Sequence, residues 1–364
     1  MKIIEIAPDL HAVNSIANNA IYSHSASLSD GLVDFGHDVH IFCSEESVSK
    51  AKMHTSTIPL SKIEASEKIK RYYTFTHISK AFEFAKQNKA DIIHAHFNLL
   101  SAFFYKLVDI PTLVSIHSPI SDETKPFLDI YKDCKFLSFS LAQRKQMPQL
   151  NWYANIYHGV DTSVFTFNEK PEDYLLYLGR ITEDKGVHFA IETAKAMNLP
   201  LKIAGPSYPT EGYWQKMIEP HIDGIKVQYM GRVGFFDKIK LFQKAKVLLF
   251  PSTWNEPFGY AMIEAMSCGT PVVGFGNGSV PEIIKDGKTG YVVNNVQEMI
   301  EAVHKINNID RKVVRRRAED FFSLEKMLQG YQNVYQRIIN ENKIKKTKSK
   351  KENVIDLDIP KVII

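Results

Sequence analysis

The sequence predicts an α/β protein of two doubly wound domains, on two observations. Short apolar runs alternate with helix-length segments along both halves of the chain, as expected for parallel sheets buried on both faces. The chain has 364 residues, more than one domain usually contains. A polar stretch with a proline and mixed charge, residues 165–173, is the expected linker between the two domains.

Composition and cysteine usage favour a cytoplasmic globular protein. Apolar residues make up 44% of the chain and charged residues 24%, which suits two buried cores. Cys43, Cys134 and Cys268 are far apart and odd in number, as expected for reduced thiols. Lys2 and Glu5 interrupt the opening apolar run, so no signal peptide is expected, and no run is long enough to span a membrane.

The first half is expected to form one sheet with flanking helices. The expected strands are residues 2–7, 39–43, 91–94, 112–117 and 136–139, with a last strand and turn at 155–161. The expected helices are residues 22–35, 75–87, 99–108 and 124–132. Residues 44–71 are polar without a clear period, so only a short strand at 56–59 is expected there.

The second half repeats this alternation. The expected strands are residues 174–178, 201–205, 227–231, 247–250, 271–274 and 290–293. The expected helices are residues 187–197, 235–245, 260–268, 297–306 and 323–339. Several of these strands end in glycine, which suits a ligand bound at the carboxyl edge of a parallel sheet.

The most informative stretch is 247–274, a strand, loop, helix and strand. Its loop and helix carry Glu256 and Glu264, eight residues apart. Gly259 lets the backbone approach a ligand closely, and the amides that follow it form an anion site at a helix N-terminus. Carboxylates beside an anion site suit a sugar joined to a phosphate. The alternative is that both glutamates are ordinary acids that favour the helix dipole.

The string EPFG-x4-EAM-x-CGTPVV in this stretch resembles the E-x7-E signature of retaining glycosyltransferases of the GT-B fold, family 4 type. The resemblance implies two Rossmann-like domains facing a central cleft, with a C-terminal helix that crosses back to the first domain. The domains implied are 1–165 on the acceptor side and 166–325 on the donor side. Residues 326–341 would form the crossing helix.

A second string, GR-x4-KG at 179–186, also resembles that family. Arg180 offers a planar fork and Lys185 a point charge across a strand-to-helix turn, so both can face a diphosphate. The alternative is that they pair with Glu183 and Asp184 at the surface. The resemblance further places the nucleotide base at the turn of Gly231, Arg232 and Val233, held mostly through backbone.

In the first half, the family usually has a Gly-Gly pair that approaches the donor phosphates. Asn18 and Asn19 stand at that place here, and asparagine tolerates left-handed backbone angles. His117 matches the position of a family histidine that faces the donor sugar, although a histidine of the cleft wall is an alternative. With His94 and His96 it could also be imagined as a metal ligand, but no carboxylate or cysteine cluster accompanies them, so no metal site is expected.

The expected function is retaining transfer of a hexose-type sugar from a nucleotide diphosphate sugar to a glycan, lipid-linked or small-molecule hydroxyl. Arg180 and Lys185 would neutralise the diphosphate, Glu264 would accept from ribose hydroxyls, and Glu256 would orient the sugar with backbone of Phe258, Gly259 and Tyr260. The resemblance implies no metal or other cofactor. A UDP-sugar is favoured over a GDP-sugar, and no nucleic-acid partner is expected.

Three other classes remain open. A nucleotide-sugar epimerase of similar architecture would need a general acid and base near the anomeric carbon. A non-catalytic nucleotide-sugar binding protein would keep the base and ribose contacts without needing Arg180. A dinucleotide oxidoreductase is disfavoured because no G-x-G-x-x-G follows an expected strand.

The chain ends with a basic segment. Six lysines fall within the nine residues 343–351, from Lys343 to Lys351, without an apolar pattern. Residues 342–364 are therefore expected to be a disordered tail. Such a tail could also bring a cytoplasmic enzyme to the inner face of an anionic membrane.

Overall fold

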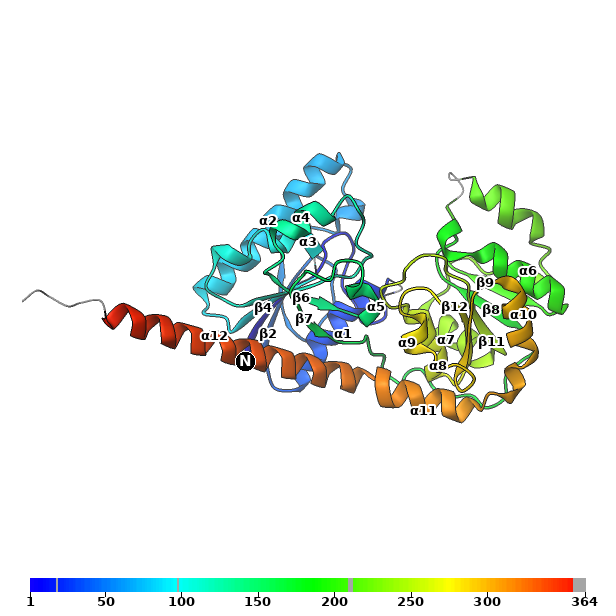
Figure 1. Cartoon of the computed structure of the whole chain (residues 1–364). Coiled ribbons are helices and arrows are strands. Elements are labelled where there is room, and N and C mark those ends of the chain that lie inside the picture. Colours follow the sequence, from blue (N-terminus) through cyan, green and yellow to red (C-terminus); the bar gives the residue numbers. More distant parts are fainter. Residues whose placement is uncertain (18, 97, 209–211, 356–364) are drawn as a thin grey trace, which may run out of the picture.

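The computed structural model describes residues 1–17, 19–96, 98–208 and 212–355. Two parallel sheets, each with its own helices, lie side by side, and a long C-terminal helix runs beneath the first of them (Figure 1). The sheets fall on either side of the predicted linker, because the last strand of the first sheet ends at Asn155 and the second sheet begins at Leu175.

The first sheet has seven parallel strands in the order β3-β2-β1-β4-β5-β6-β7. Its strands are β1 Lys2–Ile6, β2 Asp38–Cys43, β3 Lys52–Thr55, β4 Ile92–Ala95, β5 Thr112–Ser115, β6 Lys135–Ser138 and β7 Trp152–Asn155. Its helices are α1 Ala20–Asp34, α2 Glu67–Gln87, α3 Asn98–Ala102, α4 Lys125–Ile130 and α5 Leu141–Arg144. The strand order reverses between β1 and β4, which is a topological switch point.

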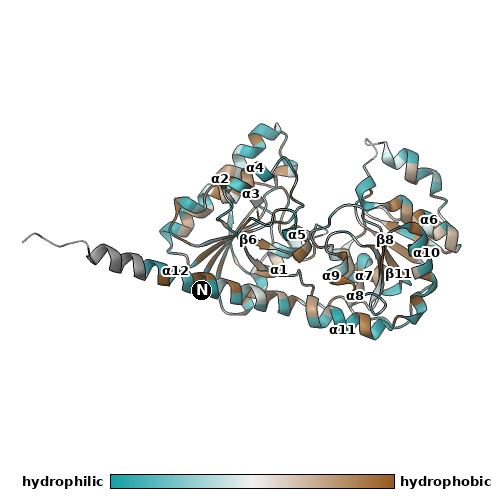
Figure 2. Cartoon of the chain, in the orientation of Figure 1, coloured by the Kyte–Doolittle hydropathy of each residue, from teal (hydrophilic) through white to brown (hydrophobic). Residues whose placement is uncertain are grey.

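Successive residues of β1 supply two different cores. Ile3 packs into the cluster that includes residues of α1 and the C-terminal helix, whereas Ile4 packs into the cluster on the side of α2. Side chains alternate across a strand, so a run of apolar residues buries both faces of the sheet. Figure 2 shows this as hydrophobic colour along the strands and mixed colour on the helices.

The second sheet has six parallel strands in the order β10-β9-β8-β11-β12-β13, with its switch point between β8 and β11. Its strands are β8 Leu175–Leu178, β9 Leu201–Ala204, β10 Val227–Tyr229, β11 Val247–Phe250, β12 Val272–Phe275 and β13 Gly290–Val293. Its helices are α6 Val187–Met197, α7 Phe235–Lys244, α8 Tyr260–Ser267, α9 Val280–Ile283, α10 Val296–His304 and α11 Arg311–Phe322.

The crossing helix is α12, Leu324–Ile355, and its predicted return to the first domain is confirmed. Tyr331 and Tyr335 on α12 are fully buried, and the helix packs against α1 and β4. The helix continues through Ile355. The expectation that the chain is disordered from residue 342 is therefore wrong for residues 342–355. Lysine and glutamate are good helix formers, and the helix already present at 341 needs no new nucleus to extend.

Other expectations differ in detail. Helix α2 begins at Glu67, eight residues before the predicted start at 75, with the Ser66 hydroxyl capping the Ile69 amide at 3.4 Å. Its first turns are polar and gave no helical period. The short strand predicted at 56–59 lies instead at β3, and the helix predicted at 99–108 is only α3 and a 3₁₀ turn. Among the described residues, no helix has the length and apolarity to cross a membrane.

Candidate active site

A cavity of about 850 Å³ opens between the two domains at the carboxyl ends of their strands. From the first domain it is lined by the loop after β1 and by His117. From the second it is lined by the turns after β8, β9 and β11 and by the start of α8. Both switch points therefore open into one cavity, which is where ligands bind in open parallel sheets.

Arg180 and Lys185 follow β8, and both line this cavity. Gly186, with φ 68°, ends their turn, and a Cβ there would collide with the carbonyl of Pro251. Of the surface pairs considered as the alternative, with Glu183 and Asp184, only that of Arg180 with Asp184 is present. The Arg180 Nη2 lies 3.9 Å from Asp184, and its side chain is 48% exposed. Lys185 pairs instead with Glu256, 71 residues further along the chain.

The ion pair of Lys185 and Glu256 is largely buried, at 13% and 9% side-chain exposure. Trp254 covers it, with the Lys185 Nζ 4.3 Å from the ring centroid. Burial lowers the pKa of Lys185, and the Glu256 carboxylate opposes that shift. The loop itself is fixed because the Ser279 amide donates to the Glu256 carbonyl at 3.1 Å. The cation is thus held in place before a ligand arrives.

The start of α8 lies beside this pair. Gly259, with φ 91°, precedes the helix, and a Cβ there would come within 2.7 Å of the Met262 side chain. Phe258, Gly259 and Tyr260 all line the cavity. The helix N-terminus therefore faces the cavity next to Lys185, which is a favourable place for an anion.

Glu264, one turn into α8, has a partner that the sequence did not reveal. Its Oε1 lies 2.6 Å from the Nζ of Lys238 on α7, and both side chains are about 10% exposed. Of this pair, Lys238 lines the cavity. The prediction that Glu264 accepts from ribose hydroxyls stays a prediction, and Lys238 is a further cation beside it.

The residues predicted to approach the nucleotide lie on two sides of the cavity. Gly231 has φ 64°, and its carbonyl accepts from the Gly205 amide at 2.8 Å, while Arg232 and Val233 line the cavity. Across the cavity, Asn19 caps α1 by accepting from the Ile21 amide at 3.4 Å, and it lines the cavity too. The other predicted residue there, Asn18, lies outside the described residues.

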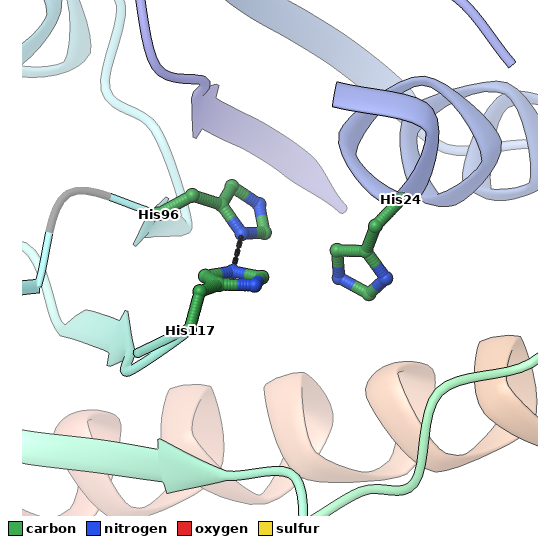
Figure 3. A group of neighbouring side chains, drawn as sticks. All are labelled: His24, His96 and His117. Carbon is green, nitrogen blue, oxygen red and sulfur yellow. Dashed lines mark hydrogen bonds between the residues drawn. The ribbon is translucent and has the colours of Figure 1, made fainter. Parts of the chain in front are cut away.

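His117 lines the cavity on the first domain, and buried histidines lie behind it. Its Nε2 lies 2.9 Å from the Nδ1 of His96, and His24 of α1 faces both rings (Figure 3). Burial lowers the pKa of His117 and of His24 well below 6.5, and neighbouring histidines add to the shift. These imidazoles are therefore neutral at pH 7.

Behind His96 lies a buried carboxylate that the sequence did not mark. Glu5 Oε2 is 3.0 Å from His96 Nε2 and 3.1 Å from His94 Nδ1, and Glu5 Oε1 accepts from the Tyr335 hydroxyl at 2.8 Å. Burial would raise the pKa of Glu5, but His94 and His96 outweigh it and hold that pKa at about 2.

Two groups of side chains in this region could each offer ligand atoms to a metal within 4.8 Å of one another. One group is His24, His96 and His117, and the other is Glu5, His94 and His96. The three histidines considered from sequence, His94, His96 and His117, are thus divided between two groups. In the first group, His96 and His117 share a hydrogen bond and His24 meets both rings edge-on. In the second group, both histidines lie within hydrogen-bonding distance of the Glu5 carboxylate.

His24 also joins the two domains. Its Nδ1 lies 3.2 Å from the hydroxyl of Tyr260 on α8 and 3.1 Å from the Nδ1 of His158. The ring of His158 stacks on Phe139 at 3.8 Å, and the Tyr331 hydroxyl lies 3.2 Å from His24 Nε2. Tyr260 was predicted only for its backbone, whereas its side chain lies against the first domain.

The residues missed from sequence share one feature. Glu5, His24 and Lys238 have side chains that can ionise, but they stand outside any recognised string. Each acquires its partner through sheet order or helix packing. The one available signal was a charged Glu5 within an otherwise apolar strand, since a buried carboxylate needs a partner.

Comparison with known proteins covers both domains. The family model described as Glycosyltransferase Family 4 matches residues 23–166, and that described as Glycosyl transferases group 1 matches residues 162–319. An uncharacterized glycosyltransferase of Methanocaldococcus jannaschii is 23% identical over an alignment of 301 residues, and the match covers 74% of this chain and 83% of that protein.

Two solved structures show the same fold along nearly the whole chain. Sucrose-phosphate synthase from Thermosynechococcus elongatus has a TM-score of 0.75 at 18% identity, covering 93% of this chain and 99% of that one. The Anabaena protein HepE, in complex with UDP and glucose, has a TM-score of 0.70 at 17% identity, covering 93% and 100%. Together with the two family matches, these findings place the chain among the glycosyltransferases of the family 4 type with the GT-B fold.

Proposed function

We propose that the protein transfers a hexose-type sugar from a nucleotide diphosphate sugar to a hydroxyl acceptor, with retention of anomeric configuration and without a metal. The observation that carries the proposal is the arrangement at the cavity. Arg180, Lys185 and the N-terminus of α8 meet on one side, and His117 lies on the other. Anion-binding groups in one domain thus face a polar floor in the other.

The donor diphosphate fits the cationic side. Cleavage of the anomeric C–O bond builds negative charge on the leaving diphosphate, and fixed cations placed there lower the barrier. Arg180 can bind two phosphate oxygens with its planar fork, whereas the Lys185 ammonium can bridge Glu256 and one oxygen. These side chains take the part that a divalent cation plays in other transferases, so the proposal requires no metal.

The remaining residues are assigned to sugar and nucleotide. Glu256, held beside the phosphate site, would accept from donor sugar hydroxyls, and Glu264 with Lys238 would face the ribose. Gly231, Arg232 and Val233 would hold the base. HepE is named as binding UDP and glucose, so UDP is the first nucleotide to test. The acceptor, whether a glycan, a lipid-linked sugar or a small molecule, would enter on the side of Asn19 and His117.

The test uses donor hydrolysis, in which water replaces the unknown acceptor. UDP-α-glucose, GDP-α-mannose and ADP-α-glucose are each incubated with the protein in EDTA, and proton NMR follows the anomeric proton of the freed sugar before it mutarotates. The α-anomer is expected first, together with nucleotide diphosphate. Release of the β-anomer, or loss of turnover in EDTA that Mg²⁺ restores, would contradict the proposal. Donor epimerised without release of nucleotide would indicate an epimerase instead.

A further inference from the structure

Three side chains form a line that runs from the interior of the first domain to the cavity. Glu5 lies on β1, His96 directly follows β4, and His117 follows β5, so the line crosses three neighbouring strands. The contacts are 3.0 Å from Glu5 Oε2 to His96 Nε2 and 2.9 Å from His96 Nδ1 to His117 Nε2. Figure 3 shows the second of these as a dashed line.

Counting protons along this line leaves one assignment of the ring protons of His96 and His117. An ionised carboxylate only accepts hydrogen bonds, so His96 Nε2 must carry the proton. A neutral imidazole has one protonated nitrogen, so His96 Nδ1 is an acceptor. The facing nitrogen, His117 Nε2, must then donate. Since His117 is neutral as well, its other nitrogen, Nδ1, has the lone pair.

The surroundings of Glu5 keep its end of the line ionised. The Tyr335 hydroxyl donates to Glu5 Oε1 at 2.8 Å, and His94 Nδ1 lies 3.1 Å from Oε2. The pKa of Glu5 is about 2, so it is a carboxylate at neutral pH. Burial lowers the pKa of His96 to about 4, which keeps that ring neutral, as the proton count requires.

We propose that Glu5 and His96 are positioning residues that hold His117 in the tautomer protonated on Nε2, so that this histidine meets a bound ligand as a hydrogen-bond acceptor. For the sugar transfer proposed above, on which this use of His117 rests, an acceptor suits a sugar hydroxyl. It also suits the positive charge that develops on the sugar ring, because the buried carboxylate polarises the line toward the cavity.

A metal held by His24, His96 and His117 would require the opposite tautomer. A metal binds the imidazole lone pair, so coordination through His117 Nε2 would place the proton on Nδ1. The hydrogen bonds of His24 go to Tyr260, Tyr331 and His158. The two interpretations therefore differ in one observable, the nitrogen of His117 that carries the proton.

The direct test is ¹⁵N NMR of the full chain labelled at its histidines, at pH 7.5 in EDTA. The signals of His117 are identified by their loss in His117→Asn. Protonated Nε2 and unprotonated Nδ1 are expected for both His96 and His117, and a coupled Nε2 proton should be seen for each. A proton on Nδ1 of His117, or a doubly protonated ring, would overturn the proposal. The spectrum is then repeated with Zn²⁺ added. A spectrum that shifts to the Nδ1-protonated form at stoichiometric Zn²⁺ would favour the metal site.

Two substitutions of His96 separate positioning from packing. In His96→Gln the amide can still donate to Glu5 and accept from His117, whereas in His96→Leu it can do neither. The Nε2-protonated signal of His117 should persist in His96→Gln and be lost or exchange-broadened in His96→Leu. Donor turnover should fall about tenfold in kcat in His96→Leu, the size of one hydrogen bond, with donor KM within about threefold and partial recovery in His96→Gln.

Equal kcat in both variants and the wild type would contradict the positioning role. If His96→Leu fails to fold, the wild-type spectrum and His96→Gln still decide. If the wild type transfers no sugar at all, the proposed function fails, whereas the tautomer result stands on its own.

Discussion

The ammonium of Lys185 and the carboxylate of Glu256 form a buried ion pair at the cavity, although they lie in different loops. The loops follow β8 and β11, the two strands at the switch point of the second sheet. The pair is neutral as a unit, and so is the pair of Lys238 and Glu264, so the excess positive charge offered to a diphosphate comes from Arg180 and the start of α8. Lys185 contributes to diphosphate binding because Glu256 holds its ammonium group in a fixed position at the cavity.

Loss of one partner should therefore destabilise the fold more than loss of both. Lys185→Met leaves the Glu256 carboxylate buried without its cation, and about 3 kcal/mol of unfolding free energy should be lost. The double variant Lys185→Met/Glu256→Gln should recover at least about 1 kcal/mol of it. Urea unfolding of the wild type, both single variants and the double variant measures this. Strictly additive effects would mean that the two side chains do not interact.

The Tyr260 hydroxyl links the second domain to the first through His24. Tyr260→Phe removes its contact with His24 in the first domain, and about 1 kcal/mol of stabilisation of the closed arrangement should be lost. The radius of gyration from small-angle X-ray scattering should rise slightly. Tyr229→Phe is the matched control, because its hydroxyl bonds the Gly205 carbonyl at 2.9 Å within the second domain. An equal change in both variants would argue against a specific role for Tyr260.

Acidification should destabilise the protein through its buried histidines. The folded-state pKa of His24, His117 and His158 is lowered well below 6.5 by burial first, and that of His96 is lowered to about 4. The unfolded chain therefore binds more protons below pH 6.5. Stability is complete above that pH and falls as pH decreases, by up to about 1.4 kcal/mol per pH unit for each such histidine.

Denaturant unfolding at pH 8, 7, 6 and 5 measures this dependence. Glu5 extends the pH dependence of stability to lower pH. Its folded-state pKa is about 2, so its contribution to the free energy of unfolding is lost only as pH falls below 4.5. His158→Phe keeps the stacking on Phe139 and should reduce the slope between pH 6 and 5 by about one histidine's share. Stability unchanged from pH 7 to 5 would contradict these lowered pKa values.

The basic end of α12 gives a prediction for lipid surfaces. Each lysine near an anionic membrane contributes about 1 kcal/mol. Replacement of Lys343, Lys345 and Lys346 by Gln should therefore weaken binding to phosphatidylserine vesicles at least tenfold in co-sedimentation, and added salt should have a similar effect. The control replaces Lys50, Lys52 and Lys62 by Gln, which changes the net charge by the same amount. These three lysines pair with acids elsewhere on the first domain. Equal loss in both triple variants would show a general charge effect.

The fold was predictable because its signals are local. Buried parallel strands such as β11 and β12 are continuous apolar runs, and Gly259 and Gly269 delimit α8. The start of α2 could not be predicted from the spacing of apolar residues, because the first turns of this helix are mostly charged. The end of α12 was misjudged because a lysine-rich segment attached to a packed helix extends it, whereas the same segment alone would not be helical.

The candidate site was only partly predictable. Arg180, Lys185 and Glu256 lie in strings that sequence alone could mark, and the structure brings them to one cavity. The partners of those residues were not visible, because Lys238 reaches Glu264 through the packing of α7 on α8. Glu5 and His96 meet only through the order of the strands, which places β1 next to β4.

The most direct measurement is calorimetric titration of UDP into the wild type and Arg180→Ala. The Arg180 side chain is half exposed, and its ion pair with Asp184 is long, at 3.9 Å. Such a pair contributes little stability, so the loss of Arg180 should leave the melting temperature nearly unchanged. Loss of a charge-assisted contact of about 1.5–3 kcal/mol should weaken UDP binding by about tenfold to a hundredfold. The matched control, Arg316→Ala on the exposed face of α11, should bind UDP as the wild type does. Wild-type affinity in Arg180→Ala would contradict a diphosphate held between Arg180, Lys185 and the start of α8.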